Sequence, residues 1–303
     1  MSFSEEVREE LASAPLPDRD CCRLALLSGL IRTAGSYHLR GRGEVHVEVE
    51  LPAGRPARRA VELLRLLGAT CEIRTHRERR FRSGQRVEIS CAGDDRTLDV
   101  LHEAGILSAS HAPAARPPAR LLARAHCRGA YLRGAFLAAG TVAPPRRPAH
   151  LEIRTHDAAA ATFLAKIAAR DGIVLRVRER PSHAAVYTKR LATLEDLLAH
   201  IGASDGVLRL VEGEVVSAAR QDANRQANAE TANLRRQVVA ARRQLSAIGA
   251  LDLGALPPEL AAAAALRIEH PELPLGELAV LGDLSKATLA GRLRRLEALA
   301  DDA

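Results

Sequence analysis

The sequence is poor in aromatic residues and has no long apolar run. Aromatic side chains make up 2% of its 303 residues and tryptophan is absent, which argues against binding single-stranded nucleic acid by base stacking. No apolar run is long enough to cross a bilayer. The first ten residues are polar and acidic, without the apolar core of a signal peptide. We therefore expect a cytoplasmic protein that has no membrane partner.

Cysteine is also scarce, and its spacing suggests neither a disulfide framework nor a zinc ribbon. The number of cysteines is odd, and no two of them form a C-x-x-C pair. We expect reduced and mostly buried thiols, with no metal ion and no cofactor. The five residues are Cys21, Cys22, Cys71, Cys91 and Cys127.

Lysine is nearly missing, although basic residues are in excess. Of 44 basic residues only Lys166, Lys189 and Lys286 are lysine, and the net charge is +7. This balance favours an anionic partner such as nucleic acid. From Val216 onward 11 basic residues stand against 11 acidic ones, so the excess lies in the first two thirds of the chain.

An internal repeat organises those first two thirds. The segments LSGLIRTAG and LRGAFLAAG each end a helical pattern with a glycine, and these two glycines, Gly35 and Gly140, are 105 residues apart. Glycine is the residue expected just beyond a helix C-terminus. Small residues inside both segments predict that the two helices cross closely on a pseudo-two-fold axis. These small residues are Ser28, Gly29, Gly134, Ala135 and Ala138.

The segments that follow the two helices repeat in the same order. Strand patterns occupy residues 45–50, 70–75, 85–90, 150–155, 173–178 and 183–188. Helical patterns occupy residues 55–67 and 157–170, and a further helix begins near Thr97 and near Thr193. This order predicts two α+β halves with antiparallel sheets.

The remainder of the chain is predicted to be helical. A polar stretch, NRQANAETANL from Asn224, predicts a helix whose side chains either dock domains or touch DNA, and the sequence leaves both open. After a break at residues 249–254, Pro257 and Pro258 occupy the place where proline is tolerated at a helix start. The expected divisions are residues 1–110, 111–215, 216–254 and 255–303, the third being a polar helical linker.

The last division has the pattern of a helix-turn-helix. Helices are predicted at residues 259–269, 275–281 and 286–300, and Ser285 is a good N-cap for the third. That third helix carries one apolar stripe, formed by Leu289, Leu293 and Leu296. In a helix-turn-helix the second helix of the motif enters the major groove. The alternative is a small helical bundle that binds protein.

Taken together, these segments resemble the WhiA family of bacterial regulators. LSGLIRTAG and LRGAFLAAG resemble the LAGLIDADG motif of homing endonucleases. SFSEEVREEL at Ser2, Cys21-Cys22-Arg23, HLEIRTHD at His150 and NRQANAETANL resemble other family segments. The resemblance covers nearly the full chain. It implies a duplicated LAGLIDADG-like domain with two antiparallel sheets and pseudo-two-fold symmetry, followed by an all-α helix-turn-helix domain.

The acids that an active LAGLIDADG enzyme needs are replaced in this sequence. In such enzymes the penultimate motif position is an acid that holds a divalent cation, and here Ala34 and Ala139 stand there. Magnesium needs oxygen ligands, which a methyl group does not provide. Glu44, the nearest acid after the first motif, lies nine residues beyond Gly35. We therefore expect neither nuclease activity nor any other enzymatic activity.

Arginines on the predicted strands and hairpins offer a second possible DNA surface. They either contact phosphates, as the saddle of a homing endonuclease does, or are ordinary solvated arginines, and the sequence does not decide between these readings. They are Arg74, Arg77, Arg79, Arg80, Arg82, Arg86, Arg176, Arg178, Arg180 and Arg190.

The resemblance implies a sequence-specific transcriptional regulator of sporulation, cell division or chromosome segregation that binds double-stranded DNA in the nucleoid. It also implies a WhiB-type iron–sulfur regulator and RNA polymerase as partners. The alternative is a protein-interaction scaffold with only accessory DNA binding. Many relatives carry Asn-His where Ala290-Gly291 stand here, so the bases that are read stay open. The residues expected at the DNA are Ser285, Lys286, Ala287, Thr288, Gly291, Arg292, Arg294 and Arg295.

Overall fold

The computed structural model divides into two compact units, Met1–Val216 and Ser217–Ala303, each with its own apolar core. It describes residues 1–39, 45–77, 85–91 and 93–301. None of the helices within these ranges combines the length and the apolar content that a bilayer crossing requires. The four-part division expected from the sequence stays a prediction.

The N-terminal unit consists of two halves that share one element order from α2 and from α5 onward. The first contains α1 (Phe3–Ser13), α2 (Asp20–Ala34), β1 (Gly35–Leu39), β2 (Val45–Pro52), α3 (Arg55–Leu67), β3 (Cys71–Arg77), β4 (Gln85–Cys91) and α4 (Asp95–Glu103). The second contains η2 (Ala119–Leu122), α5 (Ala125–Ala139), β5 (Gly140–Val142), β6 (Leu151–Thr155), α6 (Ala158–Ala169), β7 (Arg176–Arg180), β8 (His183–Thr188) and α7 (Leu191–Ile201). The last helix to start in this unit, α8 (Ser204–Gly249), continues into the C-terminal one.

Each half forms an antiparallel sheet, and the strand order is the same in both. The described strands are ordered β1-β2-β4-β3 in the first sheet and β5-β6-β8-β7 in the second. Apolar residues on one face of each sheet are buried, as Val47 and Val49 are in β2 and Leu151 and Ile153 are in β6. This arrangement confirms the α+β fold and the duplication.

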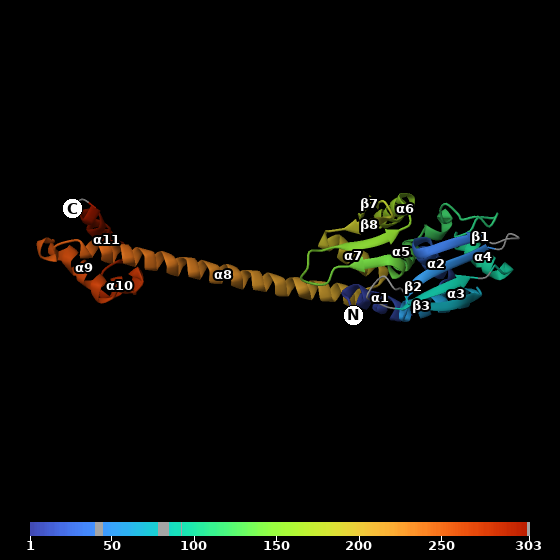
Figure 1. Ribbon diagram of the computed structural model, residues 1–303, viewed down its shortest axis with the longest axis horizontal. Helices are drawn as coiled ribbons and strands as arrows, with labels where there is room; N and C mark the ends of the chain where they lie inside the picture. The colour runs from blue at the N-terminus through green and yellow to red at the C-terminus, as the bar shows by residue number, and fades with distance from the viewer. Residues whose placement is uncertain (40–44, 78–84, 92, 302–303) are drawn as a thin grey trace. The chain divides into compact units, whose positions relative to one another are not determined.

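The motif helices α2 and α5 pack against each other between the two sheets (Figure 1). A Cβ atom added to Gly29 would lie 2.8 Å from the carbonyl carbon of Tyr131 and closer still to its oxygen. One added to Gly134 would lie 2.8 Å from the nitrogen of Leu30 and closer still to the carbonyl oxygen of Leu26. Because Leu26 and Tyr131 are themselves 105 residues apart, the contact is reciprocal, which confirms the pseudo-two-fold axis.

The strands β1 and β5 were not predicted from the sequence. They have five and three residues, too few for an alternating pattern to stand out. Gly35 and Gly140 do end α2 and α5, but with φ of −82° and −76° they are extended rather than left-handed. Glycine is needed there for space, because an added Cβ would lie 2.5 Å from the Ile31 oxygen and 2.7 Å from the Phe136 oxygen.

A buried ion pair ties α5 to the turn after α6. Arg128 donates hydrogen bonds from Nε to Asp171 Oδ2 at 2.8 Å and from its Nη2 to Oδ1, and the two side chains are only 10% and 9% exposed. The Arg128 Nη1 also donates to the carbonyl oxygen of Ala123 at 2.7 Å. The hydrogen bonds from Arg128 hold the pKa of Asp171 below its ordinary value.

The C-terminal unit is helical, as expected. After α8 come η3 (Leu253–Ala255), α9 (Pro258–Glu269), α10 (Leu275–Leu281) and α11 (Lys286–Asp301). Alanines in its core let the helices approach closely. The apolar core cluster consists of Ile248, Leu260, Ala263, Ala264, Leu278, Ala279, Leu289, Leu293 and Leu296. Because Ile248 belongs to α8, the end of that long helix is part of this core.

Candidate nucleic-acid interface

The start of α11 is fixed by Ser285. Its Oγ accepts a hydrogen bond from the backbone N–H of Thr288 at 3.0 Å, and its backbone carbonyl accepts one from Leu289 at 3.0 Å. A side-chain cap of this kind satisfies an otherwise unpaired N–H in the first helical turn. The Thr288 hydroxyl lies 2.8 Å from the Ser285 hydroxyl, so both side chains take part in the cap.

A short turn connects α10 to α11 and determines their relative direction. The backbone N–H of Leu284 donates to the Ala279 carbonyl at 2.9 Å. Asp283 adopts a left-handed conformation with φ of 50°, which aspartate tolerates better than most residues because its short side chain bonds locally. An added Cβ at Gly282 would lie 2.8 Å from the Leu266 side chain. A larger residue would therefore require the Leu266 side chain of α9 to shift.

The two faces of α11 differ sharply. The predicted apolar stripe is confirmed, since Leu289, Leu293 and Leu296 are almost completely buried. Most of the residues expected at the DNA lie outside that stripe and are exposed, while Arg292 is half-buried. The exposed ones are Ser285, Lys286, Ala287, Thr288, Gly291, Arg294 and Arg295. One rigidly held helix thus presents all of these positions.

The positive charges on α11 are largely uncompensated. Within the described parts of the chain, the side chains of Lys286, Arg292 and Arg295 form no ion pair or hydrogen bond. The Arg294 Nε donates only to the carbonyl oxygen of Ala290, one turn back on the same helix, at 3.3 Å. Exposed cations without acidic partners are suited to contact phosphate oxygens.

Arg267 was not anticipated from the sequence. This arginine of α9 is 2% exposed, and its Nη1 donates to the carbonyl oxygens of Leu273 at 2.9 Å and His270 at 3.3 Å. Burial lowers the pKa of its guanidinium. Arg267 therefore fixes the connection from α9 to α10. The only sequence signal for this role is an arginine within an alanine-rich apolar helix.

A second unanticipated contact joins the end of α8 to α11. The Arg243 guanidinium donates from Nε and Nη2 to the two carboxylate oxygens of Glu297, at 3.1 and 2.9 Å. Planar two-bond pairing of this kind fixes orientation as well as distance. No sequence pattern marks two residues that are 54 positions apart, so only the structure reveals this brace.

The two degenerate nuclease positions lie at equivalent places in the fold. Ala34 and Ala139 are the last residues of α2 and α5, the two helices that pack together. The methyl groups at these helix ends provide no oxygen ligand for a divalent cation.

Several arginines of the sheets are paired with acids on neighbouring positions. Arg74 lies 3.5 Å from Glu72, Arg86 lies 3.4 Å from Glu50, and Arg178 lies 2.5 Å from Glu152. Arg176, Arg180 and Arg190 are exposed. Arg79, Arg80 and Arg82 lie outside the described residues. Whether the sheet arginines contact phosphate stays a prediction.

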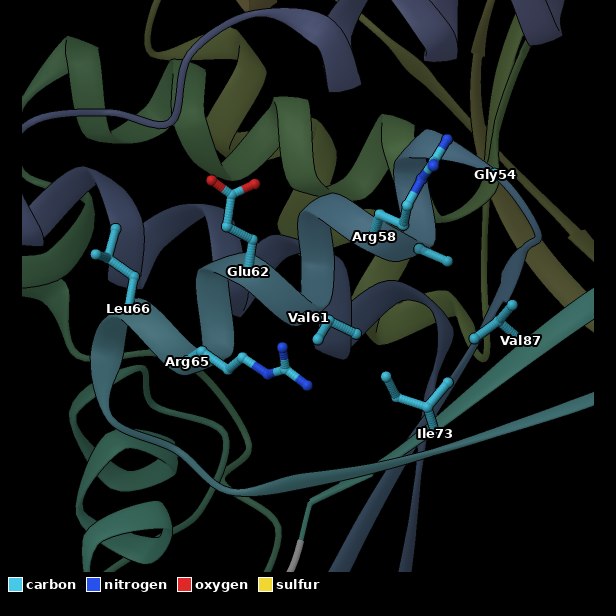
Figure 2. A pocket seen from close by; sticks show the side chains of 9 residues that line it. Gly54, Arg58, Val61, Glu62, Arg65, Leu66, Ile73 and Val87 are labelled. Atoms are coloured by element: carbon cyan, nitrogen blue, oxygen red, sulfur yellow. The ribbon is translucent and has the colours of Figure 1, made fainter.

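A separate groove of about 780 Å³ lies between α3 and the strands β3 and β4. Figure 2 shows Val61, Ile73 and Val87 around this hollow, with the Arg65 side chain reaching toward it. The lining of this groove is mainly apolar, and it shares no residue with the surface of α11.

Comparison with known proteins accounts for almost the whole chain. The models of the WhiA N-terminal LAGLIDADG-like domain, the WhiA LAGLIDADG-like domain and the WhiA C-terminal HTH domain match residues 20–107, 128–220 and 223–300. A "Probable cell division protein WhiA" from Heliobacterium modesticaldum is 36% identical, over 99% of this chain and 96% of the relative. One from Symbiobacterium thermophilum is 35% identical, over 99% of this chain and 98% of the relative. The chain belongs to the WhiA family.

A solved structure of full-length DUF199/WhiA from Thermatoga maritima has the same fold. It has a TM-score of 0.60 and 23% sequence identity to this chain, and the match covers 100% of this chain and 99% of that one. These findings confirm the family resemblance and the fold of two LAGLIDADG-like halves followed by a helix-turn-helix. The WhiA C-terminal HTH domain therefore corresponds to α9, α10 and α11 together with the C-terminal part of α8.

Proposed function

We propose that this WhiA-family chain is a nuclease-inactive, sequence-specific DNA-binding regulator of transcription. It acts on the nucleoid in the cytoplasm, in sporulation, cell division or chromosome segregation. The main support is the basic surface of α11, where Lys286, Arg294 and Arg295 are exposed and Arg292 is half-buried. Ser285 caps this helix and three buried leucines anchor it.

In this proposal the two ends of α11 have different roles. Lys286, Ala287 and Thr288 lie in the first turn, which in a helix-turn-helix meets the base edges, and Ala287 suits contact with a thymine methyl. Gly291 has no side chain and an added Cβ there would meet no atom within 4 Å, so the helix can approach the DNA closely. Arg292, Arg294 and Arg295 lie further along and contact phosphates.

The LAGLIDADG-like halves contribute DNA affinity or partner contacts rather than strand cleavage. Ala34 and Ala139 stand where an active enzyme needs metal-binding acids, so these halves lack the ligands for that reaction. One short helix contacts only a few base pairs, each worth about 1–3 kcal/mol of discrimination. Joint action with a WhiB-type iron–sulfur regulator and RNA polymerase, as the family resemblance implies, supplies the missing specificity.

The direct test is fluorescence-anisotropy binding to a pool of genomic duplexes over a series of salt concentrations, with magnesium present. The wild type is compared with Arg294→Ala/Arg295→Ala. Loss of two phosphate contacts is expected to reduce the slope of log K against log salt by about 2. Duplex integrity is followed on denaturing gels during the same incubations.

A matched control is Arg58→Ala/Arg65→Ala, which removes the same charge from exposed positions on α3. We expect this variant to bind with the wild-type slope. An equal loss of affinity in both variants would indicate unspecific charge attraction. No binding at low salt would favour the protein-interaction scaffold, and magnesium-dependent cutting would refute the nuclease-inactive assignment.

A further inference from the structure

Three cysteines and one histidine gather where α2 and α5 begin, far from α11 in sequence. Their sulfur and imidazole nitrogen atoms all lie within 4.8 Å of one another. We name this set the Cys–His cluster. It consists of Cys21, Cys22, His126 and Cys127.

The histidine ring is at the centre of the contacts within this cluster. His126 Nδ1 lies 3.0 Å from the Cys22 sulfur and 3.3 Å from the Cys127 sulfur. The other ring nitrogen, Nε2, lies 3.3 Å from Nη1 of Arg19. Nδ1 therefore faces the two buried sulfurs, while Nε2 faces a positive charge.

The cluster follows the internal repeat. Cys21 and His126 are 105 residues apart, and so are Cys22 and Cys127, the same offset that relates Gly29 to Gly134. Each half thus supplies two ligand atoms from the first turn of its motif helix, and the pseudo-two-fold axis brings the two pairs together. Neither helix has a side-chain hydrogen bond that caps its N-terminus.

We propose that the Cys–His cluster binds one zinc ion, which joins the first turn of α2 to that of α5. Three thiolates and one imidazole are ligands typical of structural zinc sites, and four protein ligands leave no open position for catalysis. Sulfurs around zinc lie about 3.8 Å apart, because each Zn–S bond is about 2.3 Å long. Atoms that already lie within 4.8 Å reach this spacing by small side-chain movements.

Binding through Nδ1 has two chemical consequences. The thiols release their protons, as zinc ligands must be deprotonated. The neutral ring then carries its proton on Nε2, so the hydrogen bond from Arg19 ends. The ion has a way in, because Cys21 and His126 are exposed whereas Cys22 and Cys127 are buried.

The experiment uses the full chain purified under reducing conditions. Zinc content is measured by elemental mass spectrometry, and Co²⁺ is titrated in as a spectroscopic substitute whose visible absorption reports tetrahedral thiolate ligands. The variants Cys21→Ser and His126→Ala remove exposed ligands, which keeps the risk of misfolding low. Cys71→Ser is the matched control, a half-buried cysteine of β3 outside the cluster.

We expect one zinc per chain in the wild type and in Cys71→Ser. Each ligand variant is expected to bind zinc at least about 100-fold more weakly and to lose the cobalt spectrum. Zinc at 100 times its Kd should raise the Tm of the wild type by about 5–10 °C, and should leave the Tm of Cys21→Ser unchanged. Less than stoichiometric zinc, unchanged binding in both ligand variants, or a disulfide that persists under reductant would overturn the proposal.

Discussion

The close approach of Gly29 in α2 to the backbone of Tyr131 in α5 yields a quantitative prediction. In Gly29→Ala the new Cβ would lie 2.8 Å from the Tyr131 carbonyl carbon and nearer still to its oxygen, whereas real Cβ atoms essentially never come within 3.0 Å. The obstacle is backbone and cannot rotate away. The two helices must therefore separate by roughly 1 Å, which loosens the leucine packing around them.

The expected loss of stability lies at the upper end of the overpacking range, about 3 kcal/mol. For a unit of this size, Met1–Val216, 1 kcal/mol corresponds to about 2–4 °C, so Tm should fall by about 6–12 °C. Ser28→Ala is the matched control on the same helix. The Ser28 side chain is fully buried and, among the described residues, its Oγ has no hydrogen-bond partner, so its removal should shift Tm by less than about 2 °C.

Tyrosine fluorescence provides a specific assay for this unit. The chain has no tryptophan, and its three tyrosines, Tyr37, Tyr131 and Tyr187, all lie in Met1–Val216. Thermal unfolding followed by tyrosine emission therefore reports the N-terminal unit alone. A Tm for Gly29→Ala within 2 °C of the wild type, roughly a fifth of the shift expected from overpacking, would refute the reasoning about the helix pair.

Two further predictions concern an ion pair and a helix cap. Asp171→Asn leaves the buried Arg128 guanidinium without its charge partner and should cost about 3–5 kcal/mol at pH 7, measured by urea unfolding with tyrosine emission. The folded-state pKa of Asp171 is lowered. The extra stability of the wild type over Asp171→Asn is therefore fully present above the ordinary pKa of about 3.9, and it is lost as the pH falls through the pKa of the folded state. A stability difference between wild type and Asp171→Asn that stays constant down to the most acidic pH would contradict this. Ser285→Ala removes the acceptor for the Thr288 N–H and should destabilise the C-terminal unit by about 0.5–2 kcal/mol, measured by circular dichroism. The control is Ser182→Ala, which changes an exposed serine in the turn before β8. This control should leave the stability of the C-terminal unit unchanged.

The elements that the sequence predicts well are those determined by neighbouring residues. The stripe of Leu289, Leu293 and Leu296 follows from helical spacing, and the Ser285 cap follows from residue type, so α11 is found in nearly its full extent. β2 and β4 are found because their apolar residues alternate. The strand β5 is not found, since three residues carry no period.

The contacts that the sequence does not predict join positions far apart in the chain. Arg243 and Glu297 show no local pattern, and the partner of Arg267 is a pair of backbone carbonyls rather than a side chain. The Cys–His cluster is a partial exception. Its members lie 105 residues apart in two pairs, Cys21 with His126 and Cys22 with Cys127, as the internal repeat requires. A search for C-x-x-C spacing within one segment does not find such ligands, because two separate helices bring them together.

The backbone contact between α2 and α5 also bears on how the two halves find each other. Glycine meets backbone at this contact, so the contact does not distinguish α5 of the same chain from α5 of another chain. The α5 of a second chain offers α2 the same surface. Two chains can therefore exchange halves and form an intertwined dimer with the same internal contacts. Residues 104–124, which link α4 to α5, oppose this exchange, since a tether of roughly 20 residues holds the halves at a millimolar effective concentration. The connecting segment, rather than the helix surface, makes each half pair with the other half of its own chain.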